Sequence, residues 1–111
     1  MNQHKKGILA ESFSVVLLRL LGYKIIKQRY KTKLGEIDII AKKRKTIFLF
    51  EVKYRKTAQE ALESITPQQI SRIKNAFLLY TQENHLENYD VIIKIIALSK
   101  SNLPKIVTIT A

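Results

Sequence analysis

Hydrophobic and polar positions recur along this chain with two different periods. From about Ile8 to Leu21, Leu, Val and Phe recur at helical spacing, and Gly22 supplies a C-terminal stop. From Lys24 to Lys33 the pattern changes to alternation, with basic residues on one strand face. The chain therefore predicts a helix followed by a strand that carries positive charge along one side.

Two further segments predict strands that are buried on both faces. They span about Glu36 to Ala41 and Ile47 to Tyr54, and both are nearly continuous in Ile, Leu, Phe and Val. A charged turn, Lys42-Lys43-Arg44-Lys45, joins them. The pattern predicts a hairpin in the interior of a sheet.

The second half of the chain predicts a helix and two more strands. After a polar connection, Thr66-Pro67-Gln68-Gln69 indicates a helix start with Thr as N-cap, and this helix runs to about Glu83. Tyr89 to Leu98 and Leu103 to Thr110 predict strands around a polar turn. The order α-β-β-β-α-β-β favours one α/β domain over residues 1–111, with a mixed central β-sheet flanked by helices.

Charge is distributed unevenly along the sequence. The 111 residues carry a formal net charge of +11, and residues 1–56 hold 15 Lys/Arg against 4 Asp/Glu, which accounts for the whole excess. A basic surface attracts a polyanion such as nucleic acid, or an anionic membrane. Zero cysteines exclude a disulfide framework and are typical of a reducing compartment, so we expect a cytoplasmic protein. No segment is apolar for long enough to span a bilayer.

The four acids of the basic half occupy unusual positions. Carboxylates on a phosphate-binding surface weaken its binding of phosphate, unless they bind a further group. If Lys43 to Thr46 form a four-residue loop in the predicted hairpin, Asp38 lies opposite Glu51, and Glu36 lies opposite Lys53. Opposed side chains have Cβ atoms about 5 Å apart, which is too close for two ionised carboxylates unless a cation lies between them.

This arrangement predicts a metal site. Oxygen ligands favour a hard ion such as Mg²⁺ or Mn²⁺, and the lack of Cys argues against zinc. Lys53 beside such an ion could position or deprotonate an attacking water and stabilise charge that develops on a phosphoryl oxygen. Acids, metal and lysine beneath a basic surface suit the hydrolysis of a phosphodiester.

Basic residues near this cluster are candidates for contact with nucleic acid. Those on the predicted first strand repeat every 6 to 7 Å or so, which suits successive phosphates. The same residues could instead protect an edge strand from pairing with another sheet. The candidates are Lys27, Arg29, Lys31, Lys33, Arg55 and Lys56.

Several segments resemble a known family. Asp38 followed by Glu51-Val52-Lys53 resembles the D…ExK signature of the PD-(D/E)XK nuclease superfamily, which has the restriction-endonuclease-like fold. The chain also resembles the YraN family of predicted endonucleases, itself similar to archaeal Holliday-junction resolvases. The segments that carry this second likeness are Gly7 with Glu11, Gly22-Tyr23, Gly35-Glu36-Ile37-Asp38, Phe50-Glu51-Val52-Lys53 with Arg55, and Tyr89-Asp90-Val91.

The resemblance implies a restriction-endonuclease-like fold and metal-dependent cleavage of structured or branched DNA in repair or recombination. It also implies Glu11, Asp38 and Glu51 as ligands of Mg²⁺ or Mn²⁺ or of the metal's water, and Lys53 as the catalytic lysine. Glu36 is a further candidate ligand, or else serves the turn or an ion pair with Lys53. Resolvases act as dimers, which leaves a homodimer open here.

The chain departs from the family pattern at three positions. Arg29 stands where the family tends to have Asn, Gln69 where it tends to have Lys, and Asn88 where it tends to have Arg. Gln69 either supports the site or closes a capping box at the second helix. These departures bear on the choice of substrate and on the efficiency of cleavage.

Three alternatives to a DNA nuclease therefore stay open. One is a nucleic-acid-binding module that keeps the fold and cuts slowly or not at all. A second is an RNA-processing nuclease, because nothing in the sequence distinguishes a deoxyribose backbone from one with 2′-hydroxyls. The third is a non-catalytic protein held by its charge to ribosomes or membranes, which would give the carboxylates no role.

Overall fold

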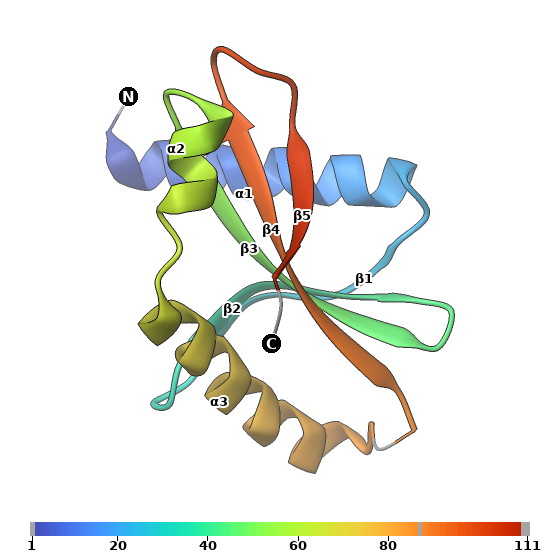
Figure 1. Cartoon of the computed structure of the whole chain (residues 1–111). Coiled ribbons are helices and arrows are strands. Elements are labelled where there is room, and N and C mark those ends of the chain that lie inside the picture. Colours follow the sequence, from blue (N-terminus) through green and yellow to red (C-terminus); the bar gives the residue numbers. More distant parts are fainter. Residues whose placement is uncertain (1, 87, 110–111) are drawn as a thin grey trace.

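A five-stranded β-sheet with helices against both of its faces forms the centre of the molecule (Figure 1). The computed structural model describes residues 2–86 and 88–109. Thr110, where the last predicted strand ends, lies outside the described residues. The elements in chain order are α1 (Gln3–Leu20), β1 (Lys24–Lys31), β2 (Glu36–Lys43), β3 (Thr46–Arg55), α2 (Ala58–Glu63), α3 (Pro67–Asn84), β4 (Asp90–Ser99) and β5 (Lys105–Ile109).

The sheet is mixed, as predicted. Its strand order is β1-β2-β3-β4-β5, so that β1 and β5 are the edges and β3 lies at the centre. β3 and β4 run parallel, and the other neighbouring pairs run antiparallel. Parallel strands need a long crossover connection, which α2 and α3 supply between β3 and β4.

Two hydrophobic clusters cover the two faces of the central strands. On one face, α1 buries Leu18 and its neighbours against Ile39 and Phe50. On the other face, α3 buries Ile73 and its neighbours against Leu49. Because β2 and β3 are covered on both sides, they carry the nearly continuous apolar runs that the sequence shows.

The helices differ from the prediction in two places. α1 begins at Gln3, five residues before the predicted start, because the Asn2 side chain accepts a hydrogen bond of 2.8 Å from the Lys5 amide and caps the helix. The polar connection predicted before Thr66 contains a short helix, α2, whose N-cap is Thr57. Only two alanines of α2 are buried, so its sequence carries no hydrophobic period to detect.

β1 is less regular than the predicted alternation. Its register with β2 shifts between Ile25 and Lys27, which marks a β-bulge. Arg29 has a positive φ of 52°, and the strand ends at Lys31. Lys33 therefore lies in the turn that follows, and the prediction of one continuous basic strand face up to Lys33 is wrong.

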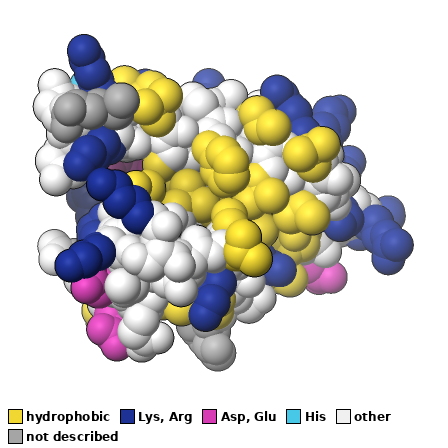
Figure 2. Space-filling view, turned by 90° about the horizontal axis from the view of Figure 1, so that it is seen from above, with side chains coloured by type: hydrophobic (Ala, Val, Ile, Leu, Met, Phe, Trp, Pro, Cys, Tyr) yellow, Lys and Arg dark blue, Asp and Glu magenta, His cyan; other side chains and the backbone are white. Residues whose placement is uncertain are grey.

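Apolar side chains are also exposed on the outer surface of α1. Leu9, Phe13, Val16 and Leu20 each expose more than half of their surface. Seen from above, hydrophobic side chains spread across the middle of the molecule, with Lys and Arg around their margin (Figure 2). Among the described residues, no helix is long and apolar enough to cross a membrane.

Replacing Gly35 by Ala is expected to lower the free energy of unfolding by about 2 to 3 kcal/mol. Gly35 is buried where the β1–β2 turn meets α3, and a Cβ atom there would overlap the backbone carbonyl group of Arg72. Chemical denaturation measures the loss. Gly7→Ala is the matched control, because a Cβ at Gly7 meets nothing within 4 Å and should add up to about 1 kcal/mol of helix stability. Equal effects of the two substitutions would contradict the packing argument.

Candidate active site

The candidate site lies where the hydrogen-bonded ladder between β2 and β3 ends. The paired residues run from Lys43 opposite Thr46 to Ile39 opposite Phe50. The turn therefore consists of Arg44 and Lys45, and its register is the predicted one. The next positions in this register are Asp38 and Glu51.

Asp38 is held between the two strands by the backbone of β3. The amide of Val52 donates a hydrogen bond of 2.8 Å to Asp38 Oδ2. A carboxylate thus accepts a main-chain donor at the point where the paired region stops. This contact directs the Asp38 side chain toward Glu51 and Lys53, the residues on either side of Val52 along β3.

Glu51 and Lys53 form a nearly buried ion pair. They lie two apart on β3 and so share a face of the strand. Lys53 Nζ is 3.5 Å from Glu51 Oε1, and the two side chains expose only 10% and 14% of their surface. An ammonium group at this depth needs a charged partner, because its desolvation is otherwise costly.

α1 contributes a third carboxylate, which is paired with β1. Arg29 Nε donates to Glu11 Oε2 at 3.1 Å. The second oxygen, Glu11 Oε1, is buried and has no hydrogen-bond partner within the described chain. Buried polar atoms are nearly always satisfied, so this oxygen points to a ligand. The residue that holds Glu11 also has a positive φ, which is a strained conformation for a bulky side chain.

These groups surround one open pocket of about 380 Å³. Its lining brings together α1, β1, β2 and β3, and includes most of the predicted site. The predicted residues that line it are Glu11, Arg29, Lys31, Glu36, Asp38, Glu51, Lys53 and Arg55. Lys27, Lys33, Lys56 and Gln69 do not belong to the lining.

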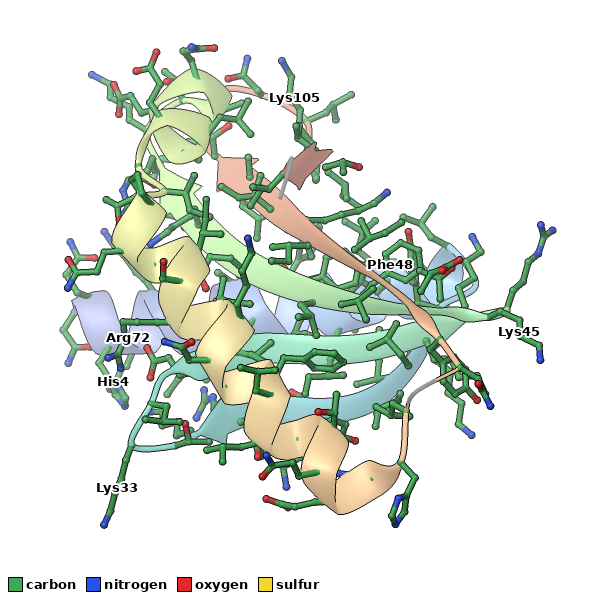
Figure 3. All side chains as sticks on the ribbon, turned by 60° about the horizontal axis from the view of Figure 1, so that its bottom comes forward. His4, Lys33, Lys45, Phe48, Arg72 and Lys105 are labelled. Atoms are coloured by element: carbon green, nitrogen blue, oxygen red, sulfur yellow. The ribbon has the colours of Figure 1, made fainter. Side chains whose placement is uncertain are left out.

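The N-terminal turns of α1 also line the pocket, which the sequence analysis missed. Gln3, His4 and Lys6 contribute side chains there. They belong to the part of α1 that precedes its predicted start. Asn2 was the available signal, because Asn is a preferred N-cap and would have moved the helix start forward. Figure 3 shows His4 at the same end of the sheet as Lys33.

Burial raises the pKa of Asp38 to about 6 and the pKa of Glu51 to about 7. Negative charge adds to both shifts, from Glu11 and Glu36 at Asp38, and from Asp38 at Glu51. The Val52 amide and Lys53 act in the opposite direction but do not cancel the increase. Ionised Asp38 and Glu51 are therefore poorly stabilised by their surroundings, and a cation bound between them would favour their charged forms.

The donor set fits a hard divalent ion held by few protein ligands. Among the described residues, no group of three or more His, Cys, Asp or Glu side chains is arranged to hold a metal. Mg²⁺ commonly takes one or two carboxylates and fills its remaining positions with water and substrate phosphate. Asp38 and Glu51 supply such a pair, and Glu11 Oε1 is the nearby oxygen without a partner.

Three further residues that the sequence singled out are Gln69, Glu36 and Asn88, and of these only Glu36 lines the pocket. Gln69 accepts a hydrogen bond of 3.0 Å from the Thr66 amide, and its own amide donates to Thr66 Oγ1 at 3.1 Å. The predicted capping box is thus confirmed. Glu36 is exposed and pairs in register with Lys31. Asn88 is exposed in the turn before β4.

Comparison with known proteins gives a consistent family match. Residues 10–94 match the model of UPF0102, described as an uncharacterised protein family. A UPF0102 protein of Sulfurihydrogenibium sp. (strain YO3AOP1) is 35% identical over 105 residues, which cover 93% of this chain and 91% of that protein. A UPF0102 protein of Bradyrhizobium diazoefficiens is 43% identical over 72 residues, which cover 65% of this chain and 54% of that protein.

The unfolding free energy of the metal-free protein is expected to fall as the pH rises from about 4 to about 7. The native Asp38 has a pKa of about 6 against an ordinary 3.8, so the native state binds more protons than the unfolded state in this range. Asp38→Asn should remove on the order of 2 kcal/mol of this pH dependence. Urea denaturation in EDTA at several pH values measures it.

Glu63→Gln provides the control for this pH series, because Glu63 is an exposed residue at the end of α2 and does not line the pocket. Its unfolding free energy should follow that of the wild-type protein across the whole range. If the Asp38→Asn curve also runs parallel to the wild-type curve, Asp38 does not titrate differently in the folded state.

Proposed function

The chain belongs to the UPF0102 family, and we propose that it is a metal-dependent endonuclease of the PD-(D/E)XK type, with a restriction-endonuclease-like fold. Its substrate is nucleic acid, with structured or branched DNA in repair or recombination as the first choice. The observation that carries the proposal is the cluster of Asp38, Glu51 and Lys53 in a pocket with basic walls. A binding surface alone has no use for buried carboxylates that repel one another.

Asp38 and Glu51 would hold the divalent ion, Mg²⁺ or Mn²⁺. When bound, the ion supplies Lewis acidity at the phosphate and lowers the pKa of water. The Val52 amide keeps the Asp38 carboxylate oriented before the ion arrives, at a distance of 2.8 Å. The raised pKa values of both carboxyls mean that cation binding competes with protons and is favoured above neutral pH.

Lys53 would act on the reacting phosphate or on the attacking water. Its ammonium group is nearly buried and is held in place by Glu51. A fixed cation in a poorly solvated position stabilises negative charge on a phosphoryl oxygen more strongly than a mobile surface lysine would. The Lys53 ammonium group can only donate hydrogen bonds, so it would orient the attacking water by donating to the water's oxygen.

The basic residues of the pocket wall would position the phosphate backbone. Arg29, Lys31 and Arg55 line the pocket that holds the carboxylates. Lys27, Lys33 and Lys56 lie outside the pocket lining and would contact the backbone beyond the reacting phosphate. Contacts of this kind read the charge of the backbone and carry little sequence information.

One observation favours a second function, a nucleic-acid-binding module with little cleavage. Arg29 already neutralises Glu11, so this carboxylate is engaged in the metal-free protein. If Arg29 keeps Glu11 when nucleic acid binds, the site has two carboxylates left for the ion. An RNA substrate would use the same pocket, and the choice of substrate in the cleavage assay decides between DNA and RNA.

Glu51→Gln and Lys53→Met are each expected to reduce metal-dependent cleavage by at least about 100-fold. Both substitutions nearly preserve side-chain shape and remove the charge that the reaction needs. Labelled duplex, four-way-junction and single-stranded DNA, together with RNA, are incubated with Mn²⁺, Mg²⁺ or EDTA. Lys105→Ala serves as the control, because Lys105 is exposed at the start of β5. Tight binding without cleavage in any metal would replace the nuclease proposal by the binding module.

Arg29→Asn is expected to increase the affinity for Mn²⁺ roughly three- to tenfold, because it removes a cation beside the site and releases Glu11. Asn tolerates a positive φ better than Arg, so the fold should persist. Isothermal titration calorimetry without nucleic acid measures the affinity. Lys31→Asn removes the same charge from the same pocket without releasing Glu11. An equal gain in both variants would assign the effect to net charge alone.

A further inference from the structure

A second group of basic residues lies at the opposite end of the β2–β3 hairpin from the candidate active site. We call it the hairpin-tip cluster, and it consists of Lys24, Lys42, Lys43, Arg44 and Lys45. Figure 3 shows Lys45 at one end of the sheet, and His4 and Lys33 at the other. None of the cluster lines the pocket that holds Asp38 and Glu51.

Aromatic rings and backbone oxygens hold two of these lysines in place. Lys42 Nζ donates to the Tyr89 hydroxyl at 2.8 Å and lies 4.8 Å from the centre of that ring. Lys43 Nζ donates to the Leu21 carbonyl at 2.9 Å and lies 4.8 Å from the centre of the Tyr23 ring. The cluster is therefore partly ordered before any ligand binds, which lowers the entropic cost of binding.

Three lysines of the cluster act electrostatically on the Tyr89 side chain. The hydrogen bond from Lys42 lowers the pKa of the Tyr89 hydroxyl, and the charges of Lys42, Lys45 and Lys24 act in the same direction. Residues 39–50 contain no Asp or Glu. Asp90 lies beside the tip, because it pairs in register with Thr46 and its amide donates to the Lys45 carbonyl at 3.1 Å, but one carboxylate does not balance the five cations of the cluster. The tip thus presents concentrated positive charge that an anion could use.

The backbone at the tip is strained at Arg44, which is one of the charged residues of the cluster. Two-residue hairpin turns favour Asn-Gly or Asp-Gly, because the turn needs a positive φ. This chain has Arg44-Lys45 there, with a φ of 59° at Arg44. Protection of a sheet edge does not account for the choice, because β2 and β3 are interior strands.

The spacing between the two ends of the hairpin matches nucleic acid. Arg44 follows Asp38 by six positions along the chain, which is about 20 Å at the rise of a strand. The same length corresponds to about six base pairs of a duplex. A stiff duplex can contact both ends at once, whereas a flexible single strand loses entropy when it bridges them.

We propose that the hairpin-tip cluster is a second nucleic-acid contact surface, which binds the backbone of a duplex about half a helical turn from the phosphate in the pocket. This inference rests on the proposed function and narrows its substrate to nucleic acid with a double-stranded segment beside the cleavage point. Arg44 and Lys45 contact phosphates, while Lys42 and Lys43 shape the surface from their places on Tyr89 and Tyr23.

The test is a binding measurement in EDTA, which does not depend on cleavage. Fluorescence anisotropy follows binding to a short duplex, a stem of about 4 base pairs (about 14 Å) closed by a tight loop, and to a long duplex of about 20 base pairs, between about 50 and 200 mM salt. In the double variant Arg44→Asn/Lys45→Gln, affinity for the long duplex should fall roughly tenfold, and the salt slope should decrease by about 2. Affinity for the short duplex, which cannot span both ends, should change much less.

Lys100→Gln/Lys105→Gln is the matched control, because it removes the same charge from two exposed lysines around the β4–β5 turn. Figure 3 shows Lys105 well away from Lys45. Equal losses in the two double variants, or no loss at the hairpin tip, would overturn the proposed surface. A loss that is the same for both duplex lengths would overturn the bridging geometry.

The two proposals fail in different ways. If no metal supports cleavage while the length-dependent loss of binding is seen, the nuclease proposal fails and the second surface stands. If cleavage depends on Lys53 while the tip variant binds like the wild-type protein, the nuclease stands and the second surface fails. Thermal unfolding monitored by circular dichroism checks that both double variants are folded. Replacing Arg44 by Asn relieves the strain of the positive φ, which favours folding of the hairpin-tip variant.

Discussion

Two carboxylates and one ammonium group, buried where the β2–β3 ladder ends, are the constraint on which the rest of the structure depends. Asp38 and Glu51 repel each other in a poorly solvated place, and Lys53 offsets only part of that repulsion. Such an arrangement destabilises a metal-free fold. It persists because the strands that carry it are clamped by hydrophobic clusters on both faces, with α1 on one side and α3 on the other.

Energetically unfavourable features also occur in the residues around Asp38, Glu51 and Lys53. Glu11 keeps one oxygen buried without a hydrogen-bond partner in the described structure, and Arg29, which pairs with the other oxygen, has a positive φ. Neither feature improves packing. Strain and unsatisfied polar atoms concentrate at functional sites, where the surrounding structure holds them against their local preference. Their location around one pocket is therefore a stronger argument for function than any single residue.

The sequence predicted those features that depend on local periods. Alternation and turn length gave the register that aligns Asp38 with Glu51, and the capping box at Thr66 and Gln69 was readable from four residues. The rest could not be predicted in this way. α2 buries only two alanines, and the Arg29–Glu11 pair joins residues 18 apart on different elements. The positive φ of Arg29 occurs at a bulky residue inside a strand, where no local rule indicates it.

The hairpin connects binding and chemistry through its register. A slip of one residue between β2 and β3 would turn the side chains of one strand to the opposite face, which would separate Asp38 from Glu51 and disrupt the packing of both hydrophobic clusters. The same register that brings Asp38 beside Glu51 therefore also sets the distance from the pocket to Arg44 and Lys45. A rigid sheet with fixed spacing suits a rigid ligand. If the proposed function holds, a duplex, whose phosphates keep a constant spacing, is therefore expected to fit the molecule better than a flexible strand.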